Sequence, residues 1–277
     1  MKYSHYIILL IITLFVVRIS CSQNKSYYEP TPKNMKFVKM GSYKNSENQT
    51  ISVHPFWISN EISNREYREF VDDIQKHPKD TLQYFNYKEL VSVPYPNLLE
   101  FISVDTLALS KLYTPGSEKY KLYQNYYTNK DFDKFPVVGV SFEGAHFYCI
   151  WKTKQELRNL KDTGLTIQDY RLPTKEEWMY VFSLVKNDKK SISNNIDCCK
   201  CNKHKSVKIS NLFGNVSEWS TQKGNSDNER IIIGNSFYNN QIMPDGKSAD
   251  ISKSFGDTGF RMVRTFLGKQ QLDNDNE

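Results

Sequence analysis

The stretch "NLFGNVSEW" at residues 211–219 gathers side chains whose types and spacing could do chemistry. Asn211 and Glu218 carry oxygen atoms that can ligate a hard cation, and Gly214 permits a turn tight enough to aim backbone carbonyls beside them. The same residues are also typical of a simple turn, in which Asn and Glu cap neighbouring amides. The residue types alone leave both interpretations open.

A second cluster, "CCKCNKH", begins at Cys198 and carries soft ligands. Cys199, Cys201 and His204 could bind zinc, but zinc sites usually take paired ligands from two separated turns, and this cluster is too compressed for that. A disulfide or a partly free thiol is favoured, and the sequence does not fix the pairing. The histidines form no recognisable catalytic triad, and no nucleophilic serine motif is present.

The N-terminus predicts export. An apolar run from Tyr6 to Val17 follows Lys2, and about twelve apolar residues suit a signal peptide but are too few to span a bilayer. The run is followed by a small residue and Cys21, as at a bacterial lipoprotein cleavage site, although Arg18 departs from that pattern. We therefore expect residues 1–21 to be a lipoprotein-type signal peptide with Cys21 as the lipidated residue, the alternatives being a simple secretory signal or an uncleaved anchor.

Length and charge restrict the function classes. The chain has 277 residues, enough for one large domain or two small ones. Its 37 basic and 31 acidic side chains give a net charge of +6, spread along the chain without a basic block. A surplus of this kind is too weak to indicate nucleic-acid binding, and no nucleic-acid partner is expected.

Short strands and capped helices must position the candidate residues. "MKFVKMGS" and "ISVHPFWIS" predict strands, and Phe135–Val140 predicts a buried one. Three helices are predicted from their N-caps: Ser63 forms a capping box with Glu66, Ser141 caps a second helix, and Thr174 caps a third. The expected organisation is a polar tether at 22–34, one α+β domain at 35–267 with two or three helices and an insertion at about 78–134, and an acidic tail at 268–277.

Five segments in order resemble the formylglycine-generating enzyme, or sulfatase-modifying factor, family. They are "FWISNEISNREYREFV", "FPVVGVSFEGAHFYCIW", "YRLPTKEEWMYV", "NLFGNVSEW" with "GNSF" after it, and "GDTGFRMVR". The resemblance implies a loop-rich variant of the C-type lectin fold over residues 35–267. Within the family, the chain is most similar to gliding-motility lipoproteins of the GldK and GldJ type, which build the type IX secretion apparatus at the outer membrane.

The resemblance implies a role for the opening stretch, because this loop holds calcium in family members. The matching positions are Asn211, Gly214, Val216 and Glu218, which would offer side-chain oxygens and main-chain carbonyls to a structural calcium. Glu218 alone supplies negative charge, so modest affinity is expected. A second calcium loop of the family would fall near residues 187–205, where no match is found.

The enzymes of the family bind copper through two cysteines in the segment that begins "GNSF" here. This chain has no cysteine after Cys201, so no copper is expected and the chain is predicted to be non-catalytic. Cys149 matches a paired family cysteine whose partner position is Met262, and a buried, unpaired thiol is expected.

Three functions compete. The first is a lipid-anchored interaction component of an envelope assembly, at the outer membrane and facing the periplasm, with Tyr-rich segments of the insertion either binding partners or packing onto the domain. The second is a formylglycine-generating enzyme. The third is a glycan or small-ligand binder, which a pocket lined by Trp219 and Phe237 would favour.

Overall fold

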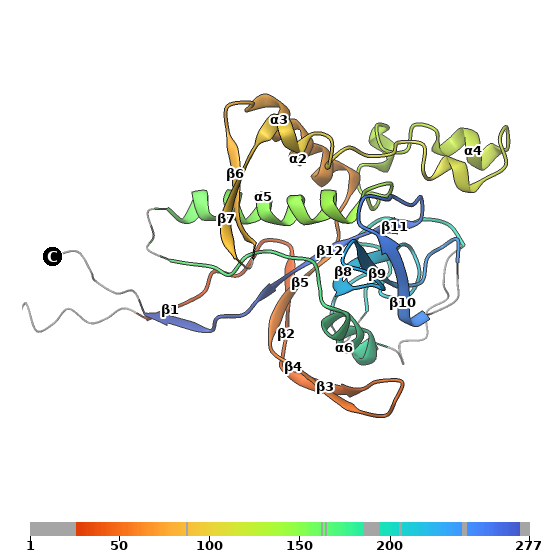
Figure 1. Ribbon diagram of the computed structural model, residues 1–277. Coiled ribbons are helices and arrows are strands. Elements are labelled where there is room, and N and C mark those ends of the chain that lie inside the picture. The colour runs from red at the N-terminus through yellow and green to blue at the C-terminus, as the bar shows by residue number, and fades with distance from the viewer. Residues whose placement is uncertain are drawn as a thin grey trace, which may run out of the picture.

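The protein is described by a computed structural model that covers residues 26–86, 88–161, 163, 165–185, 194–204, 207–239 and 243–271 (Figure 1). The expected signal peptide and Cys21 lie outside the described residues. Within these ranges, no helix is long and apolar enough to cross a membrane.

A three-stranded antiparallel sheet in the order β12–β5–β2 lies at the centre of the molecule. Its strands are β2 (Met35–Val38), β5 (Phe56–Glu61) and β12 (Arg261–Thr265). Since β5 is hydrogen-bonded along both edges, nearly all of its side chains are buried. The register places Arg261 opposite Glu61, which brings opposite charges together inside the protein.

A second sheet carries the opening stretch. Its order is β10–β9–β8–β11, with β8 at Ser217–Lys223, β9 at Glu229–Gly234, β10 at Met243–Asp250 and β11 at Thr258–Gly259. A separate hairpin joins β3 (Gly41–Lys44) to β4 (Thr50–Val53). Because Glu218 and Trp219 lie in β8, the end of the 211–219 stretch is held by strand pairing rather than by a free loop.

Three substantial helices confirm the predicted α+β class: α2 (Asn64–Lys76), α5 (Phe142–Leu160) and α6 (Lys175–Val185). The three predicted caps are confirmed as well. Ser63 and Glu66 form a reciprocal capping box, the Ser141 hydroxyl accepts from the Gly144 amide at 3.0 Å, and the Thr174 hydroxyl accepts from the amide three residues on at 3.1 Å.

The segment Phe135–Val140 is buried, as predicted, but it does not form the predicted strand. These residues are mostly buried, yet only Pro136 forms a bridge, with Ser63. Pro136 has no amide hydrogen to donate, and Gly139 takes a φ of +76°, so the segment cannot continue a regular ladder. It is instead held by single contacts such as the hydrogen bond from the Val137 amide to the Ile62 carbonyl.

The insertion at 78–134 builds two features. The first is a hairpin of β6 (Thr81–Asn86) and β7 (Glu89–Pro94), which crosses α5 and leads into α3 (Tyr95–Leu98). The second is an arm with η1 (Ser110–Leu112), α4 (Glu118–Tyr123) and η2 (Lys130–Phe132). Tyr123 and Tyr126 of the arm are buried, so the packing interpretation of these two tyrosines is confirmed.

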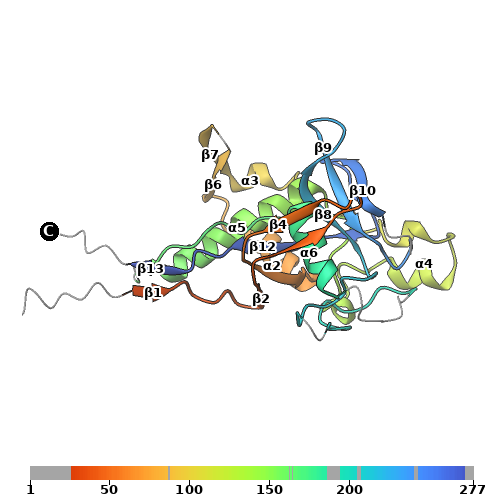
Figure 2. The same ribbon diagram turned by 90° about the horizontal axis from the view of Figure 1, so that it is seen from below.

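The two ends of the described chain meet. β1 (Ser26–Tyr28) pairs with β13 (Lys269–Gln271), which places strands inside the expected tether and the expected tail. In both views this pair lies at one end of the molecule and α4 lies at the opposite end (Figures 1 and 2). The domain boundaries themselves remain a prediction.

Candidate functional site

Residues 211–216 form a tight turn before β8, and three of them have left-handed backbone angles. Asn211, Gly214 and Asn215 have positive φ angles of 56°, 78° and 61°. Glycine takes such angles without steric cost, and asparagine is among the other residues that tolerate them best. The path turns the side chains of both asparagines toward the centre of the molecule, where they are buried.

Glu218 and Arg261 form a fully buried ion pair. Arg261 donates from Nε and Nη2 to the two oxygens of Glu218, each at 2.6 Å. The indole nitrogen of Trp178 adds a third donor to Glu218 at 3.0 Å. Bidentate pairing of this kind is strong and geometrically specific. It joins β8, β12 and α6 at one point.

Glu61 is a second buried carboxylate beside this pair. It accepts hydrogen bonds from the side-chain amides of Asn211, at 2.7 Å, and Asn215, at 2.9 Å. Burial raises the pKa of Glu61 to about 8, with Arg261 lowering it and Glu218 raising it. The cluster thus holds two carboxyl groups and one guanidinium in a space closed to water.

The four residues predicted to bind calcium differ in whether their oxygen atoms are available to a cation. Asn211 Oδ1 is buried and has no hydrogen-bond partner, as an unfilled cation ligand would be. Gly214 and Val216 lie on the same turn and can offer only carbonyls. Glu218, however, already has both oxygens bonded to Arg261. The carboxyl group without an arginine of its own is Glu61, so a cation here would draw its negative charge from Glu61. The calcium set stays a prediction.

Sequence reasoning missed Glu61, Arg261, Asn215 and Trp178. Each stands inside a segment quoted for the family resemblance, and Asn215 lies within the opening stretch itself. Their positions in those segments were visible. Their contacts were not, because Glu61 and Arg261 are 200 positions apart and meet only through the pairing of β5 with β12.

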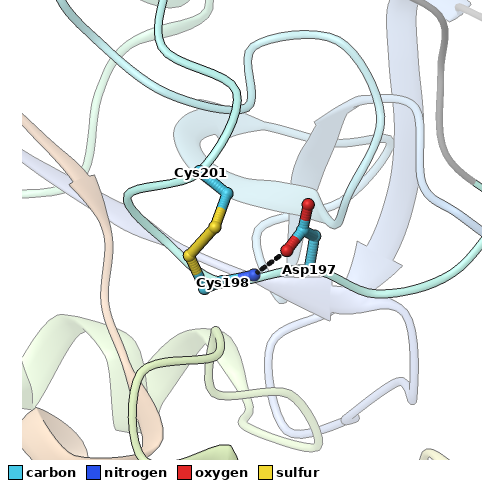
Figure 3. Close-up of side chains that lie close together, drawn as sticks. All are labelled: Asp197, Cys198 and Cys201. Carbon is cyan, nitrogen blue, oxygen red and sulfur yellow. Dashed lines mark hydrogen bonds between the residues drawn. A yellow bond between two sulfur atoms is a disulfide. The ribbon is translucent and has the colours of Figure 1, made fainter.

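The cysteine cluster holds a disulfide rather than a zinc site. Cys198 and Cys201 are bonded to each other, and the Cys198 amide donates to Asp197 at 2.7 Å (Figure 3). The zinc alternative of Cys199, Cys201 and His204 is wrong, because a bonded sulfur is not available as a thiolate. A disulfide forms and persists in oxidising compartments, which indicates an extracytoplasmic location.

Among the described residues, the free cysteines are Cys149 and Cys199, and both are buried. Desolvation raises the pKa of each thiol well above its ordinary value. The expectation of a buried, unpaired Cys149 is therefore confirmed, with Met262 also buried. Protonated thiols in such surroundings are inert.

Trp219 and Phe237 do not line a pocket together. Trp219 is fully buried in the largest hydrophobic cluster and donates to the Val140 carbonyl at 3.1 Å. Phe237 is buried in a different cluster with the tyrosines of the insertion. The pocket between these two rings that would have favoured a ligand binder does not form, because both rings are buried in packing.

Three solved structures are similar to this chain. The crystal structure of CarF covers 85% of this chain and 99% of its own at 15% identity, with a TM-score of 0.53. PvdO from Pseudomonas aeruginosa follows at 14% identity, 88% and 98% coverage and a TM-score of 0.45. Treponema denticola variable protein 1 has 17% identity, 87% and 98% coverage and a TM-score of 0.41. No curated protein matches the sequence.

The likeness to CarF, at such low identity, shows a shared fold and nothing more. The family model is more specific, because it describes the sulfatase-modifying factor enzyme 1-like domain and matches residues 24–266. That range contains every segment that builds the Glu61, Glu218 and Arg261 cluster. This chain therefore belongs to the sulfatase-modifying factor, or FGE-sulfatase, domain family.

Proposed function

We propose that this chain is a non-catalytic sulfatase-modifying-factor domain that serves as a protein-interaction module at the cell envelope. The observation that carries the proposal is that no cysteine follows Cys201. The enzymes that the chain resembles bind copper through two cysteines in the segment that spans 234–262 here, and thiolates are the ligands that select Cu(I). This segment offers only the thioethers of Met243 and Met262 as sulfur ligands.

The cysteines that the structure describes support the same proposal. Cys149 and Cys199 are buried and hold their protons, and the sulfurs of Cys198 and Cys201 are bonded to each other. A thiol must be exposed and readily deprotonated to act as a nucleophile or as a redox centre. Copper is therefore not among the cofactors that we propose, whereas a structural calcium at Asn211, Gly214, Val216 and Glu218 is.

The position of the β1–β13 pair, at one end of the molecule, supports membrane attachment at that end. Arg264 donates to the Pro30 carbonyl at 2.7 Å and lies 3.6 Å from Glu29, and both charged side chains are fully buried. The chain that leads to Cys21 therefore leaves the domain from a fixed point. An anchor at Cys21 would leave the opposite end, with the arm of the insertion, free to reach partners (Figure 2).

The insertion supplies exposed apolar side chains for such contacts. Phe85 and Leu90 are paired across the β6–β7 hairpin and are about two-thirds exposed, and Leu122 on α4 is more than half exposed. Large apolar side chains on a projecting hairpin are typical of interaction surfaces. The finer proposal, based on the resemblance, is a lipoprotein of the gliding-motility and type IX secretion apparatus, in the outer membrane and facing the periplasm.

Site-specific cross-linking of the full-length chain in its own cells tests this function. A photo-reactive residue at Phe85 should give a cross-link to an identified component of that apparatus, and Cys21→Ser should abolish both membrane attachment and the cross-link. A photo-reactive residue at Leu184, an exposed position on α6 outside the insertion, is the matched control and should give none. Equal labelling from both positions, or membrane attachment that survives Cys21→Ser, would contradict the proposal.

A further inference from the structure

A pocket of about 380 Å³ opens beside the Glu61 cluster, where β5, the start of α2, α5 and the disulfide loop meet. Its apolar lining includes Ile62, Tyr148 and Met262, and Cys198 and Cys199 form part of its wall. The volume falls within the range of pockets that take small organic molecules. Lys134, the last residue of the insertion, is the only residue that the pocket lining shares with it, so an inference from the pocket does not depend on the proposed interaction role.

Five segments that are distant in sequence each send one cation to this pocket. The cations are Lys33, Arg65, Lys134, Lys152 and Lys200. Among the residues that the structure describes, none of the four lysines forms an ion pair. Lys152 Nζ lies over the face of Trp151, 5.9 Å from the ring centroid. Arg65 has one loose, exposed pair with Glu69, at 3.9 Å.

The acidic side chains that line the pocket do not balance these cations. They are Glu61 and Glu66. Glu66 is used by the capping box, where one oxygen accepts from both the amide and the hydroxyl of Ser63. Glu61 points into the buried cluster and accepts from Asn211 and Asn215. Five cations thus face an opening in which neither carboxylate neutralises a lysine.

Positive charges gathered in one pocket repel one another, which is unfavourable unless an anion compensates them. The chain as a whole has nearly as many acids as bases, so its composition alone does not produce such an imbalance. Lysine ammonium groups on flexible stems suit oxygens of carboxylate or phosphate groups, and the apolar floor suits a carbon skeleton. The position of Lys200 inside the Cys198–Cys201 loop means that the disulfide holds one of these cations in place.

We propose that this pocket binds a small organic polyanion, with at least two carboxylate or phosphate groups on a compact carbon skeleton. The lysines contact the charged groups, and Ile62, Tyr148 and Met262 contact the skeleton. No covalent step is involved.

Isothermal titration calorimetry on the full exported chain tests the pocket. The probes are citrate and fructose 1,6-bisphosphate, with inorganic sulfate as the simple anion and glucose as the neutral control, all at one ionic strength. We expect one of the two organic polyanions to bind at least about tenfold more tightly than sulfate, and glucose not to bind. Preference for citrate or for the bisphosphate identifies the charged group, and either preference supports the proposal.

A pair of variants separates the pocket from general attraction to a basic protein. Lys134→Gln with Lys152→Gln removes two pocket cations and should weaken binding about tenfold or more. Lys121→Gln with Lys253→Gln removes the same charge from exposed positions outside the pocket lining and should leave the affinity within about twofold. The proposal is overturned if both double variants lose affinity equally, or if no organic polyanion binds more tightly than sulfate.

Discussion

Two arginines of β12, three residues apart, are both fully buried against a glutamate, and they are bound very differently. Arg261 donates two hydrogen bonds of 2.6 Å to Glu218 and a third, of 3.1 Å, to the Ser59 carbonyl. Arg264 lies 3.6 Å from Glu29, and its Nε is buried without a hydrogen-bond partner. The first arginine is tightly paired, and the second is only partly satisfied.

The difference follows from what each arginine connects. Arg261 joins three elements of the domain interior, where both partners come from strands with fixed registers. Arg264 donates to the Pro30 carbonyl in the segment next to β1, and its guanidinium also lies over the ring of Tyr170. Burial is the same for both arginines, so burial alone does not measure how strongly a charge is held. The comparison teaches that the 211–219 stretch is bound to its surroundings more tightly than the chain end is.

The largest effect is expected from breaking the tight pair. Arg261→Met leaves Glu218 charged, buried and without its partner, and such a change costs about 3–5 kcal/mol of unfolding free energy. Urea unfolding should show a lower midpoint with an unchanged m-value. Arg261→Met with Glu218→Gln should recover part of the loss, because the uncompensated charge is gone. If the urea midpoint of Arg261→Met is not lower than that of Arg264→Met, the two arginines do not differ as described here.

Arg264→Met should have a smaller and more local effect. Glu29 keeps the hydrogen bonds from the Trp57 indole and the Leu267 amide, and the segment next to β1 can shift to let water in. We expect a loss of about 1–3 kcal/mol, with faster hydrogen exchange confined to residues 26–38 and β13. Faster exchange across β8 would contradict this assignment.

Calcium tests the surroundings of Arg261 and not those of Arg264. Near Arg261 there is a second carboxyl group, that of Glu61, and the Asn211 Oδ1 has no hydrogen-bond partner. If the predicted site forms, calcium at ten times its Kd should raise the unfolding free energy by about 1.4 kcal/mol. Asn211→Ala should remove the increase, and magnesium should not reproduce it. The same increase in the Asn211→Ala variant would place the cation elsewhere.

The smallest effect concerns pH. The folded-state pKa of Glu61, about 8, lies above its ordinary value of 4.5, so the folded state holds the extra proton. Its stabilising contribution is complete below pH 4.5 and is lost as the pH rises through 8. Metal-free protein should therefore lose about 1 kcal/mol between pH 5 and 6 relative to Glu61→Gln. Identical pH profiles for the two proteins would refute the raised pKa.

Local signals in the sequence predicted the parts of the fold that local interactions determine. The caps at Ser63, Ser141 and Thr174 were found because a cap is made within four residues. The strand expected before Ser141 was wrong because an apolar run also fits an extended segment that Pro136 and Gly139 keep out of a ladder. The class and the family were visible because the five quoted segments keep their order.

The candidate site was only half visible. Asn211 and Glu218 stood out by residue type, but their partners Glu61 and Arg261 come from strands at opposite ends of the chain. The polyanion pocket was not visible, since its five cations belong to five segments and no one segment is unusually basic. Contacts that depend on the pairing of distant elements leave no periodic signal in the sequence.

The most direct test of the account is whether the purified chain, supplied with copper and oxygen, can oxidise the cysteine of a sulfatase-derived peptide. Mass spectrometry would follow the peptide, with a catalytically active member of the family as the positive control. The account predicts that the peptide mass stays unchanged, because the cysteines that the structure describes include no exposed thiol pair to bind copper. Conversion of the cysteine to formylglycine would contradict it.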